Sequence, residues 1–161
     1  MNQMYVAPLD IDHAKILFKY LDEECLYTYI PDKKFSTIAE LEARFKRLIS
    51  GSDDEDQTWL NWVMFNNAEM NQPIGRLQVT IFKEQQLAQI GYVIFKEYWG
   101  FGYATQSVLW MEQHIKSFYN IVRIEAYVDP NNIASSKVLL KNDFKLISQN
   151  EDDLYYLKEL I

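Results

Sequence analysis

The sequence predicts an α/β (α+β) fold, a mixed, mostly antiparallel sheet of about six to seven strands flanked by about four helices. Three short runs rich in β-branched and aromatic residues follow one another between Trp59 and Phe95, separated by short polar turns, which is typical of an antiparallel meander. A helical pattern over 102–119 then leads to a further strand at 122–128, and such a crossover places that strand beside the preceding one. Because no repeat, linker or low-complexity segment interrupts residues 1–161, we expect a single domain.

The composition is that of a globular protein. Of the 161 residues, 48% are apolar and 15% are aromatic. The apolar runs are far shorter than a membrane span, and no N-terminal signal pattern is visible. The single cysteine, Cys25, excludes an internal disulfide and is interpreted as a small half-buried hydrophobe rather than a nucleophile. We therefore expect a cytoplasmic protein.

The formal net charge of −7 restricts the partners. It argues against non-specific binding to nucleic acid and against docking on an anionic membrane, and it is compatible with a cationic acceptor such as an amine. An anionic cofactor would need local backbone dipoles to hold it. The acidic run 52–56 is interpreted as a solvated loop, because calcium loops need alternating ligands and a glycine at a set position, so no metal is expected.

The first third of the chain predicts a short strand over 4–8 and two helices. Asp10 or Asp12 caps the first helix, and Thr37 opens the second, with Glu40 as its capping-box partner and Gly51 as its end. Between the helices, 22–36 is an irregular, aromatic-rich loop. The apolar faces of the two helices are Ala14, Leu17, Phe18 and Leu21 in the first and Ile38, Leu41, Phe45 and Leu48 in the second.

The remaining elements follow from apolar periodicity. Strands are expected over 59–65, 74–82, 87–95, 122–128, 144–148 and 154–160. The helix over 102–119 has the apolar face Ala104, Val108, Met111, Ile115 and Phe118, and a last helix, ending at Asn142, turns Ala134, Val138 and Leu139 inward.

Two glycines stand where the strand over 90–95 gives way to the helix from 102. Gly100 and Gly102 lie within the segment 99–105, at a helix N-terminus whose free N–H groups and dipole favour an anion. The segment is neither a P-loop nor a dinucleotide fingerprint, because it lacks Gly-Lys-Ser/Thr, the third glycine and the downstream acid. A phosphate or pyrophosphate site and an ordinary turn both fit this pattern.

Four ordered motifs carry a resemblance to a known family. They are Ile90-Gly91-Tyr92-Val93-Ile94, then Trp99-Gly100-Phe101-Gly102-Tyr103-Ala104-Thr105, then Asn132-Ile133-Ala134-Ser135, and Lys141-Asn142-Asp143-Phe144. The chain resembles the GNAT superfamily of N-acetyltransferases, in particular the branch with the ribosomal-protein N-terminal acetyltransferases. The resemblance implies direct transfer of acetyl from acetyl-CoA to a primary amine, either a protein N-terminus or a small amine, within a ternary complex. It also implies a cofactor cleft between splayed strands, with the loop over 22–36 helping to build the acceptor pocket.

The resemblance assigns roles to individual residues. Backbone groups of Tyr92, Val93 and Ile94 would pair with the pantetheine arm, and N–H groups of Phe101, Gly102, Tyr103, Ala104 and Thr105 would hold the pyrophosphate. Asn132 would hydrogen-bond the cofactor or the local backbone. Ser135 would be the general acid that donates to the departing thiolate, although both residues are also good helix caps.

Four positions depart from the family pattern. Leu139 stands where many relatives have the acidic Tyr, Gln89 replaces a Glu, Trp99 replaces Gln or Arg, and Asp143 replaces a Gly. The candidates left for moving protons are Tyr27, Tyr92, Tyr103, Glu97 and Glu125, with no choice among them. Two alternatives to the enzyme therefore stay open, a non-catalytic acyl-CoA-binding sensor or interaction module and a site for another phosphorylated ligand. A homodimer and a monomer are both compatible with the aromatic content.

Overall fold

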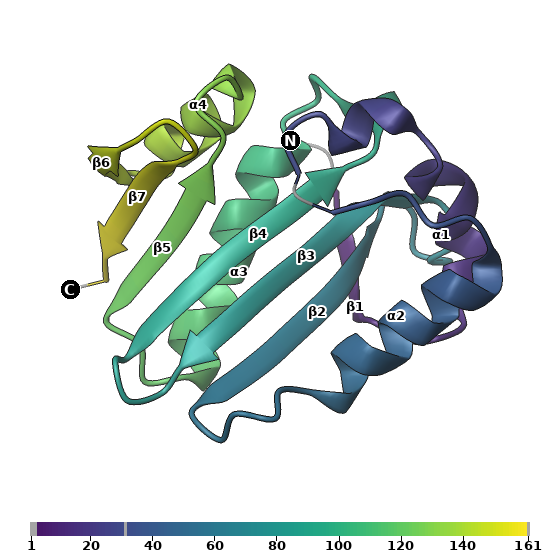
Figure 1. The fold of residues 1–161 in the computed structure, drawn as a ribbon, viewed down its shortest axis with the longest axis horizontal. Coiled ribbons are helices and arrows are strands. Elements are labelled where there is room, and N and C mark those ends of the chain that lie inside the picture. The colour runs from purple at the N-terminus through teal and green to yellow at the C-terminus, as the bar shows by residue number, and fades with distance from the viewer. Residues whose placement is uncertain (1–2, 31, 161) are drawn as a thin grey trace.

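A computed structural model describes residues 3–30 and 32–160 and is built around one sheet (Figure 1). Within this described part, seven strands lie in the order β1-β2-β3-β4-β5-β7-β6, and only the β4–β5 pair is parallel. The predicted mixed, mostly antiparallel sheet is therefore confirmed. The strands are β1 (Tyr5–Pro8), β2 (Gln57–Phe65), β3 (Pro73–Phe82), β4 (Leu87–Ile94), β5 (Arg123–Val128), β6 (Lys145–Gln149) and β7 (Leu154–Glu159).

Four α-helices in the described residues flank the sheet, as predicted. They are α1 (His13–Leu21), α2 (Ile38–Ser50), α3 (Tyr103–Phe118) and α4 (Ile133–Lys141), with the short 3-10 turns η1 (Glu24–Tyr27) and η2 (Lys96–Tyr98). None of these helices is long and apolar enough to cross a membrane.

The helix caps follow the sequence in α2 and depart from it in α1. The Thr37 hydroxyl accepts from the Glu40 N–H at 3.1 Å, and Gly51 ends α2 with a φ of 85°. Asp12 occupies the cap position of α1, yet its side chain makes no capping hydrogen bond. Instead, the Asp10 carboxylate accepts from the Asp12 N–H at 2.9 Å and fixes the entry turn.

The two faces of the sheet bury separate apolar clusters. Helices α3 and α4 cover one face over Leu77, Val79 and Ile81 of β3. Helices α1 and α2 pack on the other face, where their Leu17 and Phe45 belong to the same cluster as Val63 and Phe65 of β2. Figure 1 shows α3 crossing behind β3 and β4. Strand alternation thus decides which helix pair each side chain of the sheet meets.

Three predicted inward positions are wrong. Phe118 is 70% exposed and stacks on His114 at the helix surface, Ile38 is 38% exposed in the first turn of α2, and Ala134 is exposed on α4. The buried side of α3 instead includes Tyr103 and Ser107, in line with Met111 and Ile115 at steps of four. The hydrophobic periodicity therefore predicted this helix correctly but placed its last residue, Phe118, on the buried face, which is wrong.

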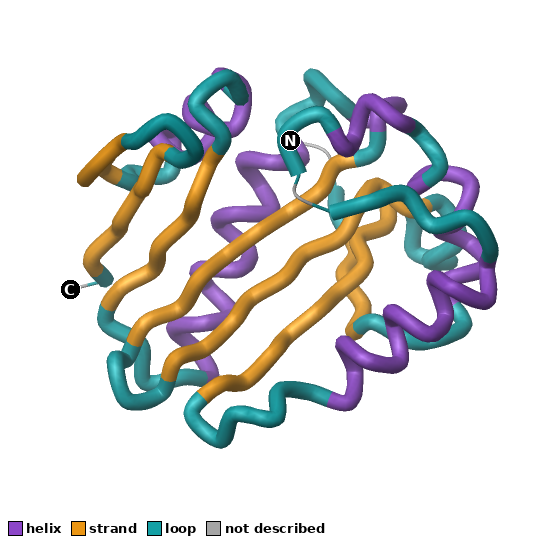
Figure 2. The backbone as a smooth tube through the Cα atoms, viewed as in Figure 1, coloured by secondary structure: helices purple, strands orange, loops and turns teal. Residues whose placement is uncertain are grey.

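The sheet opens between β4 and β5. Their parallel pairing covers only Leu87–Gln89 and Arg123–Glu125. Beyond these residues β5 keeps its antiparallel partner β7 and leaves β4. Figure 2 shows the two strands close together at one end and diverging toward the other. Half of β4 therefore presents a free backbone edge inside the molecule, as the splayed-strand prediction requires.

Candidate active site

A cleft of about 260 Å³ lies where β4 and β5 separate. Its walls come from five parts of the chain: β3, β4, the facing end of β5, α4 with the turn before it, and the loop between η1 and α2. Among the lining residues are Gly91 and Tyr92 of β4, Tyr127 of β5, and Asn132 and Ser135 of α4. Residues that are far apart in the sequence thus meet at the one place where the sheet is not closed.

The free edge of β4 carries the backbone groups of alternate residues. The Phe95 N–H donates to the Ile74 carbonyl of β3 at 2.8 Å. In an antiparallel pair of strands, every second residue directs its N–H and C=O to the partner strand. Val93 stands two residues before Phe95 and in register with Arg76, so its N–H and C=O also point to β3. Its main chain is therefore engaged in the sheet and is not free to pair with another extended chain. The backbone groups of Tyr92 and Ile94 point to the open edge.

The glycine turn has the geometry of an anion site. Gly100 and Gly102 adopt φ values of 81° and 83°, in the left-handed region that glycine tolerates best. The first intrahelical hydrogen bond of α3 runs from Gln106 to the Gly102 carbonyl at 3.1 Å. The N–H groups of the three residues in between consequently have no partner within the helix; they belong to Tyr103, Ala104 and Thr105.

Trp99, which replaces the family's Gln or Arg, has a structural role here. Its indole N–H donates to the Ile94 carbonyl at 2.7 Å, and its ring is 49% exposed. This hydrogen bond ties the glycine turn to the end of β4 and occupies one acceptor of the free edge. The Ile94 N–H stays directed to the open edge of β4.

The start of α4 places two polar side chains against β4. The Asn132 side-chain oxygen accepts from the Ser135 N–H at 3.2 Å and caps the helix. The Ser135 hydroxyl lies 2.7 Å from the hydroxyl of Tyr92. Burial raises the pKa of the Tyr92 phenol, and its hydrogen bond with Ser135 partly opposes that change. Tyr92 is therefore a neutral hydroxyl at physiological pH.

The residues that depart from the family pattern have structural surroundings of different kinds. Leu139 is fully buried and lines the cleft, so no hydroxyl arises from that turn of α4. Gln89 is in register with Glu125 across the last β4–β5 pair. Asp143 has a φ of 66°, which confirms the prediction that it ends α4 in a left-handed conformation.

The five candidate proton carriers have different surroundings. Glu125 is buried, accepts from the Tyr155 hydroxyl at 2.8 Å and does not belong to the cleft lining. Burial, followed by this hydrogen bond, raises the pKa of Tyr155 to about 12. The Tyr27 hydroxyl donates to the Leu21 carbonyl at 2.6 Å, and the Tyr103 ring packs edge-on against Tyr98. Glu97 is exposed, and the Tyr92 hydroxyl contacts that of Ser135. Only Tyr92 joins a lining residue of the cleft through a hydroxyl pair.

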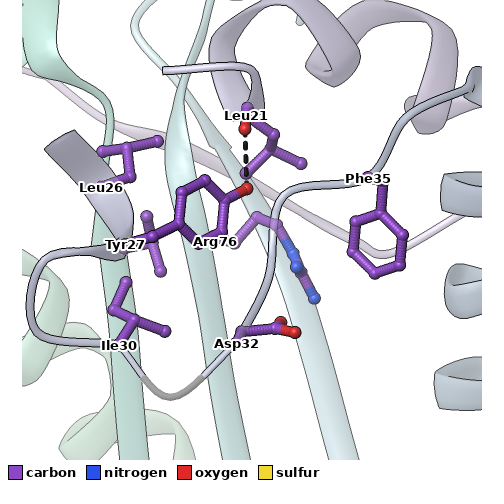
Figure 3. A pocket seen from close by; sticks show the side chains of 8 residues that line it. Leu21, Leu26, Tyr27, Ile30, Asp32, Phe35 and Arg76 are labelled. Carbon is purple, nitrogen blue, oxygen red and sulfur yellow. Dashed lines mark hydrogen bonds between the residues drawn. The ribbon is translucent and has the colours of Figure 1, made fainter. Parts of the chain in front are cut away.

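Arg76 of β3 is a polar residue of the site that the sequence analysis did not select. It lines the cleft and also an adjoining small cavity of about 30 Å³ beneath the η1–α2 loop (Figure 3). Ile30, Asp32 and Val93 line both spaces as well. The sequence contains a pattern that could have pointed to Arg76: Arg76, Gln78 and Thr80 alternate with apolar residues along β3. Such a polar stripe is usually solvated, and here α2 and the loop partly cover it.

The fold and the cleft define an acetyltransferase of the GNAT type. Residues 3–145 match the model of the acetyltransferase (GNAT) domain, so the chain belongs to this family and is an acetyl-CoA-dependent N-acetyltransferase. Among curated proteins it is similar to the uncharacterized N-acetyltransferase p20 of Bacillus licheniformis, with 25% identity over 145 residues that cover 89% of this chain and 80% of the relative.

Solved structures share the fold. RimL, the ribosomal L7/L12 alpha-N-protein acetyltransferase in complex with coenzyme A, superposes with a TM-score of 0.84 at 19% identity and covers 99% of this chain and 95% of its own. Spermidine N-acetyltransferase from Vibrio cholerae, in complex with CoA and spermine, gives a TM-score of 0.80 at 15% identity, with 99% and 96% covered. At these identities the similarity shows a common architecture.

Proposed function

We propose that this protein acetylates a primary amine by direct attack on acetyl-CoA, with both substrates held in the β4–β5 cleft. The observation that carries the proposal is the early end of the β4–β5 pairing at Gln89 and Glu125, which frees an edge of β4 next to the glycine turn before α3. The pantetheine arm pairs with the outward backbone groups of Tyr92 and Ile94. The pyrophosphate sits on the N–H groups at the start of α3, next to Gly102.

The acceptor enters from the face opposite to α3. That face of the cleft is bordered by Tyr29, Ile30 and Asp32 of the η1–α2 loop. The two solved relatives act on different acceptors, a ribosomal protein N-terminus for RimL and spermidine for the Vibrio enzyme. By the same architecture, the acceptor of this chain is a protein N-terminus or a small amine.

The reaction needs little from the side chains. The neutral amine attacks the thioester carbon, and the N–H of Ile94 at the free edge stabilises the oxyanion. The C–S bond then breaks, and the proton lost by the amine ends on the sulfur to give free CoA thiol and the amide. Holding both substrates in one cleft supplies much of the acceleration. An α-amino group has a pKa of about 8, so a useful fraction is neutral without a protein base.

Ser135 is the general acid in this proposal. Its hydroxyl gives a proton to the departing thiolate and is restored by the proton that the amine loses, so that one proton passes from nitrogen to sulfur through Ser135. In this arrangement Tyr92 is the donor in the 2.7 Å contact with the Ser135 oxygen. Because burial keeps Tyr92 protonated, it remains a donor throughout the reaction, and a donor behind Ser135 polarises the serine hydroxyl. This pair replaces the tyrosine that Leu139 does not provide.

The test combines binding with turnover. Isothermal titration with acetyl-CoA measures the cofactor site, and thiol release over a panel of amines and N-terminal peptides measures transfer. We expect binding and turnover, with Ser135→Ala lowering turnover more than binding. The matched control is Ser136→Ala on the same helix, because Ser136 does not line the cleft. Absence of acetyl-CoA binding in the folded protein would refute the proposal, and equal turnover in the two variants would remove Ser135 as the acid.

A further inference from the structure

Arg76 is an arginine of the sheet interior whose side chain is partly exposed and whose Nε is buried. It lies on the inner strand β3, in register with Val63 of β2 and Val93 of β4. Its guanidinium packs 4.9 Å from the centre of the Phe45 ring of α2. Figure 3 shows its side chain reaching from β3 toward the loop that carries Asp32 and Phe35. Only the side that faces the two cavities keeps access to solvent.

No carboxylate of the described residues forms a salt bridge with this cation. Among residues 3–30 and 32–160, no aspartate or glutamate side chain lies within 4.0 Å of the Arg76 guanidinium. Its Nε is buried without a hydrogen-bond partner. Burial, followed by the positive charge of Arg44, lowers the pKa of Arg76 to about 10, and the negative charge of Asp32 opposes this change. Arg76 is therefore still charged at neutral pH in a place where charge is costly.

Apart from its contact with the Phe45 ring, the fold gains little from such a residue. A largely buried charge without an ion-pair partner costs stability, whereas an apolar side chain of similar length would pack in the same space. Buried arginines are instead suited to planar anions, which they bind through two parallel N–H···O bonds. The small cavity beside Arg76 holds about 30 Å³, which suits a compact group and not a long chain.

We propose that Arg76 binds a carboxylate of the acceptor, so that the substrate is a small primary amine that carries a carboxylate on the same skeleton. This inference rests on the proposed function, because it identifies a second group on the amine that is acetylated in the cleft. The carboxylate lies against the Arg76 guanidinium on the side of the cavity that Tyr27 and Phe35 line, and the amine extends past Val93 to the thioester at the open edge of β4. The overall charge of −7 repels anions, which makes a dedicated local cation necessary.

The test compares each acceptor with its own amide. The panel consists of ω-amino acids of increasing chain length and the corresponding ω-amino amides, at saturating acetyl-CoA. We expect kcat/KM to favour the acid over the amide by roughly 30-fold or more at one chain length, since losing one partner of a buried charge pair has at least that effect. Arg76→Gln abolishes this preference, and Arg76→Lys restores part of it.

Two controls keep the outcomes separate. Arg47→Gln on α2 removes the same charge from an exposed arginine outside both cavities and leaves the preference intact. Acetyl-CoA titration of each variant reports the cofactor site alone. A protein that does not bind acetyl-CoA, or that acetylates no amine, contradicts the proposed function. A protein that acetylates amides or polyamines as well as the acids keeps that function and overturns the assignment of Arg76.

Stability provides an independent readout. If Arg76 serves a ligand, Arg76→Met removes an uncompensated charge and does not lower the thermal midpoint of the unliganded protein. Added ω-amino acid, in the presence of CoA, raises the midpoint of the wild type and not of Arg76→Met. A large fall in the midpoint of Arg76→Met, together with an unchanged acid preference in Arg76→Lys and Arg76→Gln, would make Arg76 a structural residue.

Discussion

Gly75 of β3 allows β3 and β4 to approach closely at the end of the open edge of β4, and its replacement by alanine is a stringent test of the structure. Gly75 is in register with Ile94 at the end of β4. A methyl group at Gly75 would collide with the Val93 carbonyl oxygen and lie only 3.0 Å from its carbon and 3.1 Å from the Ile94 Cα. All three atoms are backbone, so no side-chain rotation relieves the clash, and β3 and β4 must separate.

The expected cost is large for a single methyl group. Overpacking typically destabilises by about 1–3 kcal/mol, and this contact lies at the upper end because backbone must move. Replacing glycine in a strand otherwise stabilises by about 0.4–1 kcal/mol through the unfolded chain, which offsets part of the loss. A net loss of about 2 kcal/mol lowers the melting temperature of a domain of this size by roughly 4–8 °C.

Gly91→Ala is the matched control. Gly91 lies on the neighbouring strand, and a methyl group there meets no atom within 4 Å. Urea unfolding of the two variants measures the difference directly. We expect Gly91→Ala to equal or slightly exceed the wild type, while Gly75→Ala loses stability and, because the edge of β4 shifts, also acetyl-CoA affinity. Equal unfolding midpoints for the two variants would show that the β3–β4 spacing described here is incorrect.

Further predictions concern the cleft and the histidines. Tyr92→Phe should lower kcat by roughly five- to tenfold, the value of one hydrogen bond, with acetyl-CoA affinity unchanged. Ser135→Ala should lower kcat by about 100-fold. Equal effects on kcat and on acetyl-CoA affinity would contradict the proposed roles of Tyr92 and Ser135. Gly102→Asn and Gly102→Asp both tolerate the left-handed turn, so the added charge alone should make Asp bind acetyl-CoA roughly 10- to 100-fold more weakly in titration. Burial lowers the pKa of His13 and His114 below 6.5. As the pH falls, the unfolded chain therefore binds protons before the folded protein does. The free energy of unfolding should be constant above pH 6.5 and fall below it. His114→Gln should flatten this decline in urea titrations, and an unchanged slope would exclude His114 as its cause.

Local patterns predicted the elements well because they report one strand or helix at a time. The left-handed glycines at 100 and 102 and the cap of α2 are decided by residues within a few positions. Faces were less predictable, because burial at a helix end depends on what the rest of the chain places there. Phe118 has the correct period, yet it ends as an exposed ring on His114.

The site was predictable only where backbone forms it. The position of the glycine turn follows from the order of strand and helix, and the free edge of β4 was expected from the family resemblance. The contact between Tyr92 and Ser135 joins residues 43 positions apart, and it depends on how α4 packs across the open edge. Nor could the sequence distinguish the Val93 main chain from that of its neighbours, since the alternation of hydrogen bonds is set by the register with β3.

In the proposed function, strand β4 separates the two substrates of the reaction, and this separation would explain the distribution of polar residues around it. Tyr92 points toward α4, where it meets Ser135 on the side of the cofactor. Val93 points to the opposite face, beside Arg76 and the loop that borders the acceptor side. Because adjacent residues of a strand face opposite sides, one short segment can present a proton donor to the thiol and a wall to the acceptor. Substitutions at Tyr92 or Ser135 should therefore change the chemical step for every acceptor alike, whereas substitutions at Arg76 should change which acceptor is used. A kcat effect that varies with the acceptor in Ser135→Ala would contradict this division.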